Sequence, residues 1–308
     1  MTLVEERSLA VAGWWPSRYG ADDQAGTLNE ITVDGIVRAA GLVRRGRVID
    51  LSHELHGGIP VFPGRSFRQF LTTTAHQVNR RTPGGGPEGL GENRVNWIVE
   101  QVSSTSQLGT HIDALSHLQI GDRVYNGHRL DDLVEEHGVN RLGIETLPQV
   151  VTRGLMLDIA AARGVERLRP GDVVTPADAE EALERASLEA QPGDAILFHT
   201  GWGARWDDPD AYLAGEPGPG MDLAEWLVDH RIALTGCDTW SFGPVPPENP
   251  KRPFEVPQSL NARHGLVIVE NLRLAPLAAE GVAEFLLVIA HPKPRGATGA
   301  WIAPLAIF

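Results

Sequence analysis

Short apolar runs rich in valine and isoleucine alternate along the chain with amphipathic stretches. Apolar runs of strand length predict buried strands, and their alternation with helical patterns favours a mixed α/β domain over a helical bundle or a pure β-sandwich. The strands that we predict are Arg47–Ser52, Val95–Ser104, Gly154–Asp158, Ala195–His199, Ile232–Thr235, Leu266–Glu270 and Glu284–Ala290.

Helical patterns are fewer. The clearest start signal is at Thr175, which is suited to cap a helix whose first turn holds Pro176. The helices that we predict are Val33–Leu42, Leu130–Glu136, Pro176–Ser187 and Asp222–Asp229. No internal repeat is visible, and a chain of 308 residues with 42% hydrophobic content can build a sizeable core.

Charge and cysteine content narrow the class of protein. The chain has 40 acidic and 27 basic residues, and its net charge of −13 disfavours nucleic acid or an anionic membrane surface as a partner. No long apolar stretch or leader-like N-terminus is present, so we expect neither secretion nor membrane insertion. The single cysteine, Cys237, allows no internal disulfide and no cysteine-rich metal site, which is consistent with a cytoplasmic protein. No basic residue adjoins Cys237, which disfavours a nucleophilic role.

The sequence lacks the motifs of two common enzyme classes, the nucleotide-dependent enzymes and the serine hydrolases. The glycine-rich runs at Gly84–Gly86 and Gly215–Gly220 have neither the Gly-Lys-Ser/Thr ending of a phosphate loop nor a Gly-x-Gly-x-x-Gly pattern, so we expect neither ATP nor NAD. There is no Gly-x-Ser-x-Gly elbow of a serine hydrolase. Ser52 and His53 are adjacent, and their side chains would diverge in a strand.

The segment TSQLGTHIDALSH carries the strongest chemical signal. In an extended strand, His111 and Asp113 point to the same side, so both can bind one ion while Ile112 packs behind them. If the chain turns helical after Asp113, His117 lies about one turn further on, within proton-transfer reach of that ion. Imidazole with carboxylate suits zinc, manganese or iron better than calcium or copper. A His-x-Asp pair in a solvated turn is the plain alternative.

The same segment resembles the signature His-x-Gly-Thr-His-x-Asp-x-Pro-x-His of the cyclase-type metal-dependent amidohydrolases, which include bacterial kynurenine formamidase, isatin hydrolase and polyketide cyclases. The sequence matches at Gly109, Thr110, His111, Asp113 and His117. It has Gln107 in place of the first histidine and Leu115 in place of proline. Further similar segments are Tyr19–Thr32, Asp50–Leu55, Tyr125–His128, Phe198–Trp202, Gly236–Trp240 and the C-terminal GATGAWIAPLAIF, so the resemblance spans nearly the whole chain.

The resemblance implies a ligand set. Glu270, in the segment VIVENL, matches the family's glutamate, while Gln258 stands at the position of an upstream histidine. A divalent metal, zinc or manganese, would then be held by His111, Asp113 and Glu270 with Gln107 as a weak ligand. The expected catalytic residues are His117 and Glu270. Amide oxygens bind transition metals more weakly than imidazole, so both glutamines predict reduced affinity and allow one, two or no bound ions.

The fold that the resemblance implies is a swivelling β/β/α single domain with a mixed central sheet over residues 1–308, which includes an N-terminal arm of about 45 residues. The implied activity is hydrolysis of a C–N bond in an amide, formamide or lactam. Alternatives are lactone hydrolysis, a polyketide-type cyclisation and dehydration, and a non-catalytic binding protein that has lost metal ligands. Family members form homodimers or homotetramers. Eight tryptophans against three tyrosines would suit an aromatic small-molecule substrate.

The sequence also predicts one long loop. Asn79–Asn93 is rich in glycine and proline, which predicts a mobile connection before the metal-bearing strand. Such a loop could be a lid over the site or an ordinary surface loop.

Overall fold

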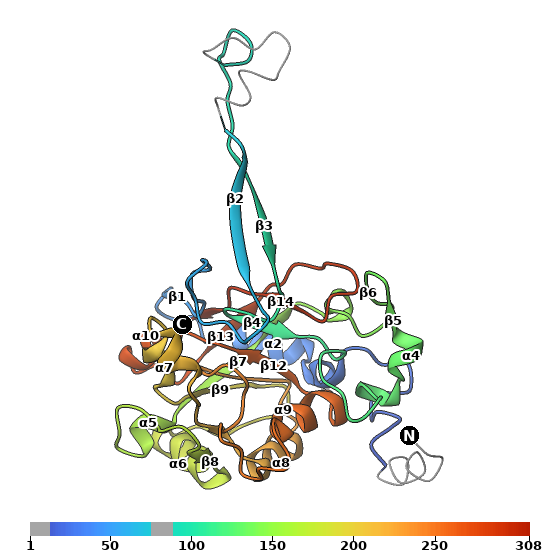
Figure 1. Cartoon of the computed structure of the whole chain (residues 1–308). Helices are drawn as coiled ribbons and strands as arrows, with labels where there is room; N and C mark the ends of the chain where they lie inside the picture. Colours follow the sequence, from blue (N-terminus) through green and yellow to red (C-terminus); the bar gives the residue numbers. More distant parts are fainter. Residues whose placement is uncertain (1–12, 75–88) are drawn as a thin grey trace.

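The computed structural model describes residues 13–74 and 89–308, and its centre is one mixed nine-stranded sheet (Figure 1). The strand order is β1 (Val48–Asp50), β15 (Leu305–Ile307), β13 (Glu284–Ile289), β7 (Val150–Asp158), β9 (Ala195–His199), β11 (Leu234–Cys237), β12 (Val267–Glu270), β4 (His111–Asp113) and β14 (Gly299–Trp301). The four strands β7, β9, β11 and β12 are parallel, and the remaining neighbours pair antiparallel. The predicted mixed α/β fold is confirmed.

Helices and hydrophobic side chains cover both faces of this sheet. The helices are α2 (Val33–Ala40), α4 (Leu130–Leu133), α5 (Ile159–Ala162), α6 (Pro176–Ala186), α7 (Pro209–Leu213), α8 (Met221–Asp229), α9 (Glu255–Gln258) and α10 (Ala275–Ala279). In β9, Ile196 and Phe198 belong to one core and Leu197 to the other. Strands buried on both faces have continuous apolar runs, and for this reason their positions could be predicted from the sequence.

A two-stranded antiparallel ribbon extends far from the body (Figure 1). It consists of β2 (Phe67–Thr73) and β3 (Val99–Ser104). We predicted one strand at Val95–Ser104 and missed β2, because both strands are largely exposed and show no alternation of buried and exposed residues. Of the predicted loop Asn79–Asn93, residues 79–88 lie outside the described part of the chain, so the hypothesis of a lid stays a prediction.

Other predicted elements differ at their ends. The helix predicted at Leu130–Glu136 was wrong beyond Leu133, because Val134–Glu135 (β5) pairs antiparallel with Gly138–Val139 (β6). Helix α6 begins as predicted, with Thr175 and Asp178 forming a reciprocal capping box. Two-residue β8 (Val173–Val174) and β10 (Gly218–Pro219) form a further small parallel pair.

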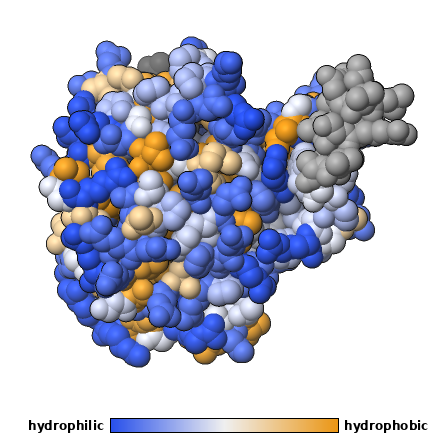
Figure 2. Space-filling model, turned by 90° about the horizontal axis from the view of Figure 1, so that it is seen from below, coloured by the Kyte–Doolittle hydropathy of each residue, from blue (hydrophilic) through white to orange (hydrophobic). Residues whose placement is uncertain are grey.

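The N-terminal part packs against the body rather than standing apart from it. Within the described residues of the predicted arm, α2 lies on β7 and β13, and the short 3₁₀ helix Gly26–Glu30 contacts β12. The face shown in Figure 2 is mostly hydrophilic, with apolar residues scattered singly or in small groups. Among the described residues, no helix is long and apolar enough to cross a bilayer.

Candidate metal centre

Strand register brings His111, Asp113 and Glu270 together at the carboxyl end of β12. Glu270 pairs directly with His111 across β12 and β4, so the two side chains lie on the same face of the sheet. Asp113, two residues along β4, shares that face, while Ile112 points into the core and is fully buried. Ligand atoms of the three residues all lie within 4.8 Å of one another. The predicted shared face of His111 and Asp113 is confirmed.

A backbone contact orients the histidine. His111 Nδ1 lies 2.9 Å from the carbonyl oxygen of Gly109, which favours a proton on Nδ1 and a lone pair on Nε2. Gly109 adopts a left-handed conformation (φ 57°), and a Cβ there would lie 2.3 Å from Leu55 Cδ2. Thr110 Oγ1 donates a hydrogen bond to the carbonyl oxygen of Asn271, at 2.6 Å, and thereby ties the approach to β4 to the end of β12.

Two buried polar atoms of this cluster have no hydrogen-bond partner among the described residues. His111 Nε2 and Asp113 Oδ1 are buried without a hydrogen bond. His111 Nε2 lies 3.7 Å from Asp113 Oδ1 and 3.4 Å from Glu270 Oε2. Burial raises the pKa of Glu270 to about 7, raises the pKa of Asp113 and lowers that of His111. Burial thus disfavours the charged carboxylates, and a divalent cation between them would remove that cost, so the residues fit a metal ion.

His117 and Gln107 flank the three ligands. His117 lies at the cavity wall, with Nε2 at 4.0 Å from Asp113 Oδ1, and its side chain is 22% exposed. Gln107 Nε2 donates a hydrogen bond to Thr298 Oγ1 at 2.9 Å. Gly299 packs closely against both this amide and Asp113, because a Cβ on Gly299 would lie 2.7 Å from Gln107 Nε2 and 3.4 Å from Asp113 Oδ1. The amide of Gln107 therefore lies at the edge of the cluster. Metal ligation by Gln107 stays a prediction.

Gln258 is engaged elsewhere. This residue is the last of α9, and its Nε2 donates a hydrogen bond to the carbonyl oxygen of Gln119 at 2.7 Å. Its amide therefore holds the segment after His117 in place, which gives the glutamine a structural contact at the position where the resemblance implied a histidine ligand.

A cavity of about 170 Å³ opens onto the cluster, and of its lining residues only Asp113, His117 and Glu270 were predicted as site residues. Its residues are Phe62, Arg65, Asp113, His117, Leu118, Trp240, Ser241, Phe254, Pro257 and Glu270. The rings of Phe62, Trp240 and Phe254 contact one another, with centroids 5.4 to 6.4 Å apart. Phe62 and Arg65 come from the irregular segment between β1 and β2. No periodic pattern marks such residues, so sequence reasoning missed them.

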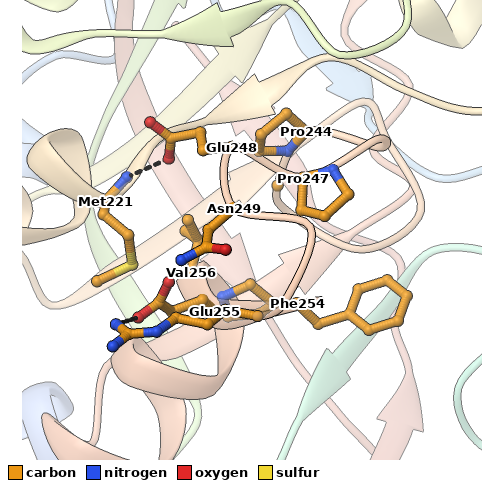
Figure 3. A pocket seen from close by; sticks show the side chains of 11 residues that line it. Met221, Pro244, Pro247, Glu248, Asn249, Phe254, Glu255 and Val256 are labelled. Carbon is orange, nitrogen blue, oxygen red and sulfur yellow. Dashed lines mark hydrogen bonds and ion pairs between the residues drawn. The ribbon is translucent and has the colours of Figure 1, made fainter.

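A second, much smaller crevice shares Phe254 and Pro257 with the wall of the metal-site cavity (Figure 3). Glu248 accepts a hydrogen bond from the backbone of Met221, and Arg252 pairs with Glu255 at 2.6 Å. The ring of Phe254 points away from this crevice in Figure 3, which is consistent with its place in the wall of the metal-site cavity. These contacts anchor the aromatic wall to α8 and α9.

The strand ends at His199 and Asp238 line a separate cavity of about 430 Å³. His199 Nδ1 pairs with Asp158 at 3.0 Å, and these contacts raise the pKa of the imidazole despite burial. Asp238 accepts hydrogen bonds from the backbone and hydroxyl of Thr200. His199 and Asp238 therefore line a pocket, and Asp238 also accepts the hydrogen bonds of the turn that follows β9. Neighbouring Cys237 is buried, and burial raises the pKa of its thiol, which agrees with a structural role.

The fold and the buried cluster of His111, Asp113 and Glu270 define a mixed α/β protein with a candidate metal site. The chain belongs to the family described as "Putative cyclase", whose model matches residues 49–244. No curated protein matches the sequence.

Solved structures agree with this placement. A crystal structure of a novel cyclase is 29% identical, with a TM-score of 0.83 over 94% of this chain and 96% of the other. Isatin hydrolase A from Ralstonia solanacearum is 20% identical, with a TM-score of 0.60 over 89% and 97%. A predicted metal-dependent hydrolase from Bacillus stearothermophilus is 20% identical, with a TM-score of 0.51 over 84% and 97%. The last two share the fold.

Proposed function

We propose that this protein is a metal-dependent hydrolase that cleaves the C–N bond of an amide, formamide or lactam with water. The observation that carries the proposal is the buried cluster of His111, Asp113 and Glu270, in which His111 Nε2 and Asp113 Oδ1 have no hydrogen-bond partner and Asp113 and Glu270 line a cavity. Membership of the cyclase family and the fold shared with an isatin hydrolase support the same reaction class.

His111 Nε2, Asp113 Oδ1 and a Glu270 carboxylate oxygen would hold the ion, for which zinc and manganese are the best matches to the donor set. When bound, such an ion polarises a carbonyl and lowers the pKa of water from 15.7 to about 7. The Nδ1 contact of His111 with Gly109 keeps Nε2 available and fixes the ring.

His117 is the residue that we assign to proton transfer. Its imidazole lies at the cavity wall beside Asp113 and remains partly exposed, so it can reach both the attacking water and the leaving nitrogen. Glu270, whose Oε2 lies 3.4 Å from His111 Nε2, would also orient the water by accepting a hydrogen bond from it. The aromatic wall of Phe62, Trp240 and Phe254 suits a flat, aromatic substituent of the substrate.

Metal content and turnover test the proposal together. Purified protein dialysed against a mixture of trace metals is expected to retain about one equivalent of zinc or manganese, and the His111→Ala variant is expected to lose it. His117→Gln should keep the metal but lower kcat on an amide panel roughly 100-fold. Absence of metal from both proteins would refute the mechanism. Turnover of a lactone panel alone would favour lactone hydrolysis, and metal binding without any turnover would favour a binding protein.

We also propose that the chain self-associates through the β2–β3 ribbon. The ribbon exposes apolar side chains, with Phe70 and Leu71 50% and 56% exposed, on strands that have no other cover among the described residues. Exposed apolar strands of this kind usually pack against a partner. Sedimentation equilibrium should show a dimer or tetramer, and replacement of both residues by serine should shift it towards the monomer.

A further inference from the structure

Arg65 places a positive charge in the wall of the metal-site cavity. Its Nη1 donates a hydrogen bond to the carbonyl oxygen of Gln107 at 2.6 Å, and its guanidinium lies over the ring of Phe62, 5.5 Å from the centroid. Among the described residues, no carboxylate lies within ion-pair distance of it. A guanidinium has five N–H donors, so most of those of Arg65 remain free for a ligand.

Charge balance shows what the cavity lacks. Two carboxylates, from Asp113 and Glu270, would neutralise a divalent ion, and the charge of Arg65 would then stand alone in the wall. The charge of Arg65 acts on the cluster, because it lowers the pKa of Glu270, although burial raises that pKa by more. A partly enclosed guanidinium without a counter-ion favours an anionic ligand, and a carboxylate matches its planar donors best.

We propose that Arg65 is a specificity-determining residue that binds a carboxylate carried by the substrate. The guanidinium lies over the ring of Phe62, which in turn contacts Trp240, so the substrate class is an aromatic amide or lactam that bears a carboxylate near its ring. This inference rests on the proposed function, because it concerns the substrate of the same site.

Paired substrates test the role of Arg65 in the metal-loaded protein. The Arg65→Gln variant is expected to raise KM for formamidobenzoate roughly 10- to 100-fold and to leave KM for neutral formanilide unchanged. Arg65→Lys, which keeps the charge, should have a smaller effect. Arg169→Gln is the matched control, because the side chain of Arg169 is 86% exposed, it does not line the cavity, and its replacement changes the net charge equally. Metal content should be the same in all variants, and an equal loss with both substrates would overturn the inference.

Binding separates this inference from the proposed function. If the wild-type protein turns over neither substrate, the hydrolase proposal fails, and calorimetric titration with benzoate and benzamide still tests Arg65. Benzoate binding that Arg65→Gln weakens roughly tenfold or more, with benzamide binding unchanged, supports the inference. Benzoate binding of equal strength in both proteins overturns it, because the metal alone would then account for the affinity.

Discussion

The metal-free protein should lose stability as the pH rises towards neutrality, and Glu270→Gln should remove the part of that loss that comes from this carboxyl. Glu270 is fully buried in the cluster, and burial raises the pKa of its carboxyl from 4.5 to about 7. An acid whose pKa is higher in the folded state stabilises folding while it is protonated. Its contribution is therefore lost progressively from pH 4.5, the ordinary value, to about pH 7, the folded value.

The size of the effect follows from the shift. Each pKa unit corresponds to about 1.4 kcal/mol, so the full loss for Glu270 is about 3 kcal/mol, of which about 2 kcal/mol falls between pH 5.5 and pH 8. An amide at this position does not titrate, so the difference between the two proteins reports the titration of this carboxyl together with its electrostatic effect on Asp113, whose pKa the Glu270 charge raises. The exposed carboxyl of Glu225 on α8 provides the control, because Glu225→Gln should leave the pH dependence unchanged.

Urea denaturation in the presence of a chelator would measure these differences. We expect the free energy of unfolding of the wild-type protein to fall between pH 5.5 and pH 8 by about 2 kcal/mol more than that of Glu270→Gln. Added zinc should restore the wild-type protein at pH 8 and have little effect on the variant. Identical pH dependence in the two proteins would refute the reasoning, since Glu270 would then not be a buried carboxyl without a counter-ion.

Substitutions at Gln107 and Gly109 test the surroundings of the cluster. Gln107→His should tighten zinc binding roughly tenfold in competition with a chromophoric chelator, because imidazole binds transition metals better than an amide; unchanged affinity would place Gln107 outside the metal's reach. Gly109→Ala and Gly46→Ala should each cost about 1 kcal/mol for a left-handed backbone. Gly109→Ala should lower the free energy of unfolding by roughly 1 to 3 kcal/mol more than Gly46→Ala, since a Cβ at position 109 would clash with Leu55 and one at position 46 meets no atom within 4 Å. Equal losses of stability in thermal unfolding would contradict the predicted clash.

Part of the site could be predicted from local rules. The shared face of His111 and Asp113 follows from the two-residue period of a strand, and it holds wherever the strand lies in the fold. The inclusion of Glu270 came from family resemblance, because the residue is far from His111 in the chain and only sheet pairing brings the two together. The amide of Gln258 has a structural hydrogen bond that no sequence pattern marks.

By itself, the sequence determined the doubly buried central strands, the capped helix α6 and the shared face of His111 and Asp113, because these depend on periodicity and local capping. Tertiary structure decided the rest. The exposed ribbon strand β2 has no burial pattern to reveal it, and β4, β14 and β15 are too short for one. The cavity wall, with Phe62, Arg65 and Phe254, is assembled from irregular segments that meet only after the sheet has formed, since contacts of that kind depend on long-range packing.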